Sequence, residues 1–224
     1  KPLSEHFNVI NVDLRNHGLS PHSKEMNYPA MAQDIVELLA DLNIDKAHLV
    51  GHSMGGKVAM ELALTHPELV NKLVVLDIAP VSYPARHTKI LQALKAVSAQ
   101  SIDDRKQADV IMQPYIEELG VRQFLLKSLA KNEEGHFAWR FNLNVLDEKY
   151  STITSNVNEN NSCSCDTLFI KGNDSDYILP EHRTAIKARF KNTKAKIIHG
   201  AGHWLHAQKP LAVNKAINDF LTAV

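Results

Sequence analysis

The chain of 224 residues is 44% hydrophobic and 22% charged, which is enough apolar material for one sizeable core, expected as a single domain with an insertion. Lysine and arginine together number 25, as do aspartate and glutamate, so there is no excess of basic charge to attract nucleic acid or an anionic membrane. We therefore expect a small molecule as the partner.

The cysteine content predicts a reducing compartment. Cys163 and Cys165 are the two cysteines, too few for a disulfide framework or a zinc cage, and one intervening residue disfavours a bond between them. No apolar run approaches the length of a membrane span, and the start of the chain lacks the pattern of a signal peptide. These features predict an intracellular protein with no metal site.

The first part of the chain predicts strands that alternate with helices. Apolar runs predict strands, and apolar residues spaced by three and four predict helices. The expected strands are residues 7–13, 46–50 and 72–78, and the expected helices are residues 28–42 and a segment from residue 57 to about residue 66. Because each strand is an almost continuous apolar run, we expect a parallel sheet covered by helices on both faces.

The alternation stops between residue 79 and about residue 150. Residues 86–99, 103–119 and 121–131 predict successive helices with no strand between them, and such an insertion is typical of a cap over the sheet. The expected division is therefore a core of residues 1–80 and 151–224 and a helical cap of residues 81–150. Phe124 and Trp139 in the cap either line a substrate pocket or pack the cap onto itself.

The sheet is expected to resume near the end of the chain. Residues 167–171 and 194–199 predict strands, and residues 180–190 and 210–221 predict helices. Two breaker-rich loops follow these strands, at residues 172–176 and 200–204.

One turn in the first part of the chain carries the strongest chemical signal. Between the strand at 46–50 and the following helix lies Gly51-His52-Ser53-Met54-Gly55. Glycine is expected two residues on either side of the serine because the incoming strand and outgoing helix come too close for a Cβ. This arrangement predicts that Ser53 is a nucleophile and that the Met54 N-H faces the same space and binds an oxyanion.

A serine nucleophile needs an imidazole to take its proton and a carboxylate to orient that imidazole. Among the 12 histidines, His203 follows a predicted strand within a glycine-rich loop, so we expect it to be the base. His52 lies inside the turn, where packing is the simpler role. His52 and Trp204 join Phe124 and Trp139 as candidate substrate-binding residues.

Four segments together resemble the α/β-hydrolase family, and within it a group of bacterial esterases. They are residues 12–21 (VDLRNHGLSP), 51–57 (GHSMGGK), 76–81 (LDIAPV) and 200–206 (GAGHWLH). The resemblance implies the α/β-hydrolase fold and a cytoplasmic serine hydrolase that acts on short acyl esters or thioesters without a cofactor. Carried over residue by residue, it implies that Ser53 is the nucleophile, His203 the base and Asp77 the acid.

The position of the acid leaves an alternative open. Many members of the family place the acid after the next core strand, where this chain has Asp174 and Asp176. Three residues beyond Gly172, where that acid is usual, the chain has Ser175 instead. Asp77 closes a strand beside the nucleophile strand, so we favour Asp77 over Asp176 and interpret the later aspartates as turn residues.

The resemblance also implies a departure at the start. The family normally opens with strands that end in a His-Gly loop, whose backbone supplies a second oxyanion donor. The His17-Gly18 pair matches a later turn of the family pattern. For the sequence as given we therefore expect half an oxyanion hole, reduced activity, and an exposed sheet edge through which chains could associate.

The function expected from the sequence is thus a serine esterase that hydrolyses short-chain acyl esters through an acyl-enzyme intermediate. A thioesterase with the same three residues is one alternative. A catalytically impaired binding protein with the hydrolase fold is another, because of the expected gap in the oxyanion hole.

Overall fold

The structure is a computed structural model that describes residues 2–223. The described chain divides into two compact units. The first, here called the core unit, consists of the residues up to Val12, Asn27–Ser82 and the residues from Ser155 onward; the second, the inserted unit, consists of Asp13–Met26 and Tyr83–Thr154. Residues 13–26 therefore belong to the inserted unit, although the sequence had assigned them to the core.

The core unit contains a four-stranded parallel sheet, as the apolar runs predicted. Its strands lie in the order β1-β2-β5-β6, so that β2 and β5 occupy the middle. The strands are β1 (Ala47–His52), β2 (Val70–Leu76), β5 (Asp166–Gly172) and β6 (Thr193–Ile198). Because all strands run the same way, their carboxyl ends meet at one edge of the sheet.

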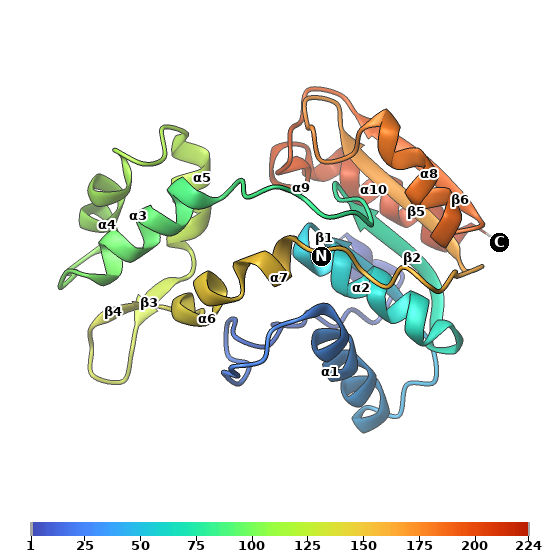
Figure 1. Cartoon of the computed structure of the whole chain (residues 1–224), viewed down its shortest axis with the longest axis horizontal. Coiled ribbons are helices and arrows are strands. Elements are labelled where there is room, and N and C mark those ends of the chain that lie inside the picture. The colour runs from blue at the N-terminus through green and yellow to red at the C-terminus, as the bar shows by residue number, and fades with distance from the viewer. Residues whose placement is uncertain (1, 224) are drawn as a thin grey trace. The chain divides into compact units, whose positions relative to one another are not determined.

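Helices cover both faces of this sheet (Figure 1). Side chains alternate across a strand, so Val75 of β2 faces α2 while Val74 and Leu76 pack in a cluster with Val213 and Ile217 of α10. The core-unit helices are α1 (Tyr28–Asp41), α2 (Met54–Thr65), α8 (Arg183–Arg189), α9 (Leu205–Gln208) and α10 (Pro210–Thr222), with 3-10 helices Leu3–Glu5, Pro67–Leu69 and Pro180–His182.

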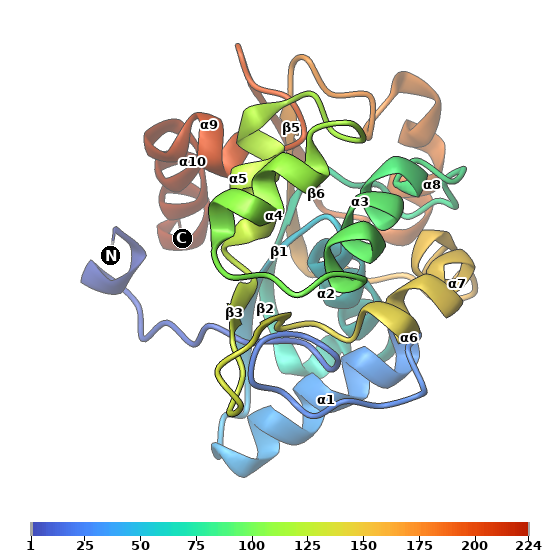
Figure 2. The same ribbon diagram turned by 90° about the vertical axis from the view of Figure 1, so that its left-hand side faces the viewer.

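The strand predicted at residues 7–13 is wrong. After the 3-10 helix Leu3–Glu5 the chain continues without regular structure, and Figure 2 shows this segment as a plain tube. Val9, Ile10 and Val12 are exposed to between 41% and 44%. An apolar run becomes a strand only when its backbone pairs with a neighbour, and within residues 2–223 no strand pairs with it; β1 lies at the edge of the sheet.

The inserted unit has its own core, formed mainly by residues of its first helices. Its elements are α3 (Thr88–Ser98), α4 (Arg105–Met112), α5 (Leu119–Leu126), β3 (Leu129–Lys131), β4 (Phe137–Trp139), α6 (Leu143–Glu148) and α7 (Tyr150–Thr154). Ten buried residues form the core: Ala93, Leu94, Val97, Ile102, Ala108, Met112, Ile116, Leu126, Leu129 and Leu143. Its segment Tyr83–Thr154 overlaps the expected insertion of residues 81–150, and the role of that insertion as a cap stays a prediction.

The expectation of an insertion made only of helices is wrong. β3 and β4 form an antiparallel hairpin in which Leu129 lies opposite Trp139, and Gly135 adopts a φ of 84° in the connection. Strands of three residues are too short to show a pattern in the sequence. The helix predicted over residues 103–119 also ends early, at Met112, because Pro114 follows closely and disfavours helical backbone before it.

The segment Asp13–Met26 is tied to the rest of the inserted unit through two asparagines. The Asn142 N-H donates to the Asn16 carbonyl at 2.9 Å, and the two side-chain amides are 3.3 Å apart. Asn16 is fully buried and has a φ of 66°, a left-handed conformation that asparagine tolerates better than most residues. Its side chain therefore needs the partners that the fold supplies.

Lys57 forms hydrogen bonds at both points where the chain leaves and re-enters the core unit. Its side chain lies on α2 and is only 2% exposed. The Nζ donates to the carbonyl of Val81 at 2.8 Å and to the carbonyl of Ser155, which flank the inserted segment Tyr83–Thr154. Burial lowers the pKa of Lys57 to about 7, because removing an ammonium group from water disfavours its charged form.

This lysine makes stability depend on pH. Between its folded pKa of about 7 and its unfolded value of about 10.4, the unfolded chain binds more protons, so stability should rise with pH. We expect the unaltered chain to gain stability relative to Lys57→Met as the pH rises from about 7 to about 10. The measurement is the free energy of unfolding of each chain in urea. Lys89→Met, at an exposed helix position, is the control; an equal pH dependence in both variants would contradict the assignment.

Candidate active site

Ser53 lies between the end of β1 and the start of α2, at the carboxyl edge of the sheet. On the strand side of Ser53 the turn is as tight as the sequence predicted, because a Cβ on Gly51 would lie 2.3 Å from the Gly55 carbonyl oxygen. The expected crowding at Gly55 itself is wrong, because a Cβ there would meet nothing within 4 Å. The second close approach falls one residue later, where a Cβ on Gly56 would lie 2.8 Å from Ile78.

The backbone of Ser53 is strained, with φ 52° and ψ −120°. Such a conformation in a residue with a Cβ persists only when surrounding contacts hold it. The Ser53 N-H donates to the Leu76 carbonyl at 3.1 Å, and the Ser53 carbonyl accepts from the Lys57 N-H at 3.0 Å. The neighbouring strand and the first turn of α2 therefore fix the serine.

Ser53, His203 and Asp77 form a continuous line of hydrogen bonds. His203 Nε2 is 3.0 Å from Ser53 Oγ, and His203 Nδ1 is 2.9 Å from Asp77 Oδ2. Because an ionised carboxylate only accepts, the ring proton of a neutral His203 belongs on Nδ1 and leaves Nε2 free to accept from the serine hydroxyl. The structure thus brings together the three residues that the sequence singled out.

Asp77 is fully buried, and three donors surround its carboxylate. Oδ1 accepts from the Gly172 N-H at 3.0 Å, while Oδ2 accepts from the Ser175 hydroxyl as well as from His203. Asp174 and Asp176, the alternative acids, are exposed. The carboxylate that contacts His203 is therefore that of Asp77, in the position that the sequence favoured.

Ser175 was expected only to occupy the position of the absent later acid, and its bond to Asp77 was missed. The loop that holds Ser175 must pass close to the loop that holds His203, since a Cβ on Gly172 would lie 2.3 Å from the Gly202 carbonyl oxygen. The signal in the sequence was that both loops follow parallel strands and so reach the same sheet edge.

Aromatic rings surround His203. The Tyr177 ring lies nearly parallel to the imidazole, with centroids 3.8 Å apart, and the Trp204 ring meets it edge-on at 5.6 Å. His52 donates from Nε2 to the His203 carbonyl at 2.8 Å, and its ring contacts that of His206 at 4.4 Å. No motif in the sequence pointed to Tyr177, because stacking of this kind depends on the fold.

His52 is neutral at ordinary pH. Burial, together with the neighbouring imidazoles of His203 and His206, lowers the pKa of His52 to about 3. The ring contacts agree with the packing role expected for it, and its candidate role in substrate binding, like that of Trp204, stays a prediction.

Met54 is the first residue of α2. Its N-H belongs to the first turn, where no carbonyl one turn earlier is available to accept it, and the helix dipole makes this end electropositive. This is the backbone donor that the sequence assigned to an oxyanion.

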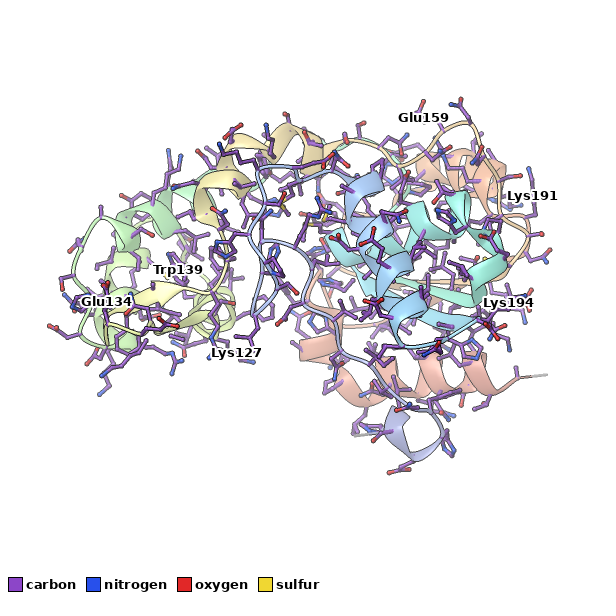
Figure 3. The ribbon with its side chains drawn as sticks, turned by 90° about the horizontal axis from the view of Figure 1, so that it is seen from below. Lys127, Glu134, Trp139, Glu159, Lys191 and Lys194 are labelled. Atoms are coloured by element: carbon purple, nitrogen blue, oxygen red, sulfur yellow. The ribbon has the colours of Figure 1, made fainter. Side chains whose placement is uncertain are left out.

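Phe124 and Trp139 lie in the inserted unit, Phe124 on α5 and Trp139 on β4, where Figure 3 labels it. Trp139 donates from Nε1 to the Leu94 carbonyl at 3.1 Å and stacks on Phe141 at 5.2 Å. With other residues of the same unit, Trp139 and Phe141 line a cavity of about 570 Å³. The contacts of Trp139 match the alternative in which the cap packs onto itself, whereas Phe124 is 37% exposed. A substrate role for Phe124 and Trp139 stays a prediction.

Within residues 2–223, no group of three or more histidine, cysteine, aspartate or glutamate side chains is placed to hold a metal ion. Among the same residues, no helix has both the length and the apolar character needed to cross a membrane.

Comparisons with known proteins agree with this geometry. Residues 1–210 match the family model described as alpha/beta hydrolase fold. The chain is 45% identical to Esterase YbfF of Escherichia coli (strain K12) over 99% of this chain and 85% of that protein. It is 41% identical to the sn-1-specific diacylglycerol lipase ABHD11 of Mus musculus over 95% of this chain and 71% of that protein. A solved structure of a marine microorganism esterase is similar, with a TM-score of 0.86 and 37% identity over 93% of this chain and 82% of that chain.

The geometry around Asp77 predicts the effect of two substitutions. Asp77→Asn keeps the shape but favours the wrong tautomer of His203, so ester hydrolysis should fall by about ten-thousandfold, whereas Asp176→Asn should lower it less than about tenfold. The measurement is kcat for a p-nitrophenyl ester near about pH 8, with circular dichroism to confirm folding. If the two effects were reversed, the acid would belong to the later loop.

Proposed function

The chain belongs to the α/β-hydrolase family and is a carboxylic ester hydrolase, and on that premise we propose that it hydrolyses short-chain acyl esters through an acyl-enzyme intermediate on Ser53. The family match and the relatives confirm the fold and the family that the sequence motifs indicated. The line of hydrogen bonds from Asp77 through His203 to Ser53 is the observation that supports the mechanism.

In the proposed first step, His203 Nε2 takes the proton of Ser53 as Oγ attacks the ester carbonyl carbon. The carbonyl oxygen becomes an oxyanion, and the Met54 N-H at the start of α2 donates to it. The imidazolium returns its proton to the leaving alkoxide, so an alcohol departs and the acyl group stays on Ser53.

In the second step, His203 takes a proton from water, and the resulting hydroxide attacks the acyl carbon. Collapse of the second tetrahedral intermediate releases the carboxylic acid and returns the proton to Ser53. Asp77 keeps its charge throughout and stabilises the imidazolium in both steps. Each proton in the cycle is thus taken and returned by one ring nitrogen, which matches the single histidine between the acid and the serine.

We extend the proposal to a reducing, cytoplasmic site of action. Cys163 and Cys165 are both free thiols, and Cys163 is buried. Disulfides persist in oxidising compartments and are rare in the cytosol, so two neighbouring free thiols support this assignment.

Replacement of the nucleophile tests the proposed function. Ser53→Ala should lower kcat for p-nitrophenyl acetate and butyrate by more than about a thousandfold, because residues of such a triad act as a unit. Ser151→Ala, at an exposed position of the inserted unit, is the matched control and should leave kcat unchanged. Turnover by Ser53→Ala above the background rate would contradict the proposal.

The same assay separates the alternative functions. A thioesterase would show a higher kcat/KM for an acyl thioester than for the ester of the same acyl group. A binding protein would bind the ester without turnover by the unaltered chain. The proposal expects turnover that depends on Ser53 and favours the oxygen ester.

A further inference from the structure

Tyr177 makes the closest ring contact with the proposed catalytic base among the ring pairs described. Its ring lies 3.8 Å from that of His203, centroid to centroid, with an angle of 18° between the planes. Tyr177 is 9% exposed, so the contact is inside the core unit and not on its surface. Neither the motifs nor the mechanism above assigns a role to this residue.

The backbone around Tyr177 is linked to the acid. The Tyr177 N-H donates to Ser175 Oγ at 3.2 Å, and the Ser175 hydroxyl in turn donates to Asp77 Oδ2. The short loop after β5 therefore carries both the Ser175 hydroxyl that binds the Asp77 carboxylate and the Tyr177 ring that covers one face of His203. A displacement of this loop would disturb both contacts together.

Acyl transfer makes a particular demand on His203. When Nε2 takes the Ser53 proton, the ring becomes a cation whose two N-H groups are directed to Asp77 and to the reacting oxygen. The side chain is 14% exposed, so water solvates little of it. The two faces of the ring remain available for contacts that stabilise its charge, and the face of an aromatic ring stabilises a cation placed over it.

Of the rings described around His203, that of Tyr177 is the one placed to stabilise a charged imidazole through its face. The His52 ring is 4.7 Å away and tilted by 41°, and the Trp204 ring is edge-on, so neither presents a parallel face. His52 is neutral because burial and nearby imidazoles lower its pKa to about 3, and it therefore does not repel the cation. The titratable groups that contact His203 or its ring neighbours are Asp77, His52, His206 and Tyr177 itself. The strand end and loop that lead to Tyr177 also carry Asp174, Asp176 and Lys171, whose ammonium donates to the Ser175 carbonyl.

We propose that Tyr177 is a positioning residue for the acyl transfer of the proposed function, whose ring face holds the His203 imidazole in line with Asp77 and Ser53 and stabilises the imidazolium that forms when Ser53 loses its proton. The phenol hydroxyl is not part of this role. The stabilisation acts on the charged ring and therefore changes the pH at which the free enzyme loses its base.

The test compares Tyr177→Phe with Tyr177→Leu by kcat and KM for p-nitrophenyl butyrate from about pH 5 to about pH 9. Tyr177→Phe keeps the face and should stay within about twofold of the unaltered chain. Tyr177→Leu should lose about tenfold in kcat with KM within about twofold. Because the cation loses stabilisation, the acid limb of its kcat/KM profile should move down by about half to one pH unit.

Tyr115→Leu is the matched control, because Tyr115 packs against the core of the inserted unit. It should lower the thermal midpoint without moving the acid limb. A Tyr177→Leu variant with unaltered kcat and an unmoved acid limb would overturn the role of Tyr177 while leaving the proposed function intact. Failure of the proposed function itself would show separately, as turnover that survives Ser53→Ala.

A series of fluorinated phenylalanines at position 177 covers the case in which Tyr177→Leu does not fold. Fluorine removes electron density from the ring face and changes its shape little, so each added fluorine should move the acid limb further down. An acid limb that does not depend on fluorine content would overturn the proposal.

Discussion

The buried carboxylate of Asp77 is the constraint on which the proposed active site depends. A charge in a fully buried position is strongly unfavourable unless hydrogen-bond donors surround it. Here the donors are His203 after β6, Ser175 after β5 and the backbone of Gly172, the last residue of β5. Satisfying one carboxylate therefore fixes the relative positions of the loops after β2, β5 and β6. That is also the geometry that places His203 against the serine.

Close backbone packing makes this arrangement possible. A Cβ on Gly51 would lie 2.3 Å from the Gly55 carbonyl oxygen across the same turn, and a Cβ on Gly172 would lie 2.3 Å from the Gly202 carbonyl oxygen of another loop. Ser53 and Asp77 both adopt positive φ values, of 52° and 51°, which are unfavourable for residues with a Cβ. The strain falls on the proposed nucleophile and acid, and the β2 and β5 carbonyls that accept their N-H groups help to hold both residues in place.

Features encoded locally in the sequence could be predicted, and features that depend on a distant partner could not. The apolar runs of β2 and β5 and the serine between β1 and α2 follow from short segments alone. The apolar run at residues 7–13 failed as a strand because pairing, which decides strand formation, is not visible in a single segment. The hairpin β3-β4 and the contacts of Ser175 with Asp77 and of Tyr177 with His203 were missed for the same reason, since each depends on residues that only the fold brings together.

Reaction with a fluorophosphonate probe, followed by mass spectrometry of tryptic peptides, tests the central claim most directly. Trypsin should release residues 47–57 as one peptide, in which Ser53 is the only serine. If Asp77 and His203 activate Ser53, the probe should label this peptide in the unaltered chain and should react at least about a thousandfold more slowly in His203→Gln. Labelling of another peptide, or equally fast labelling of Ser53 without His203, would contradict the account.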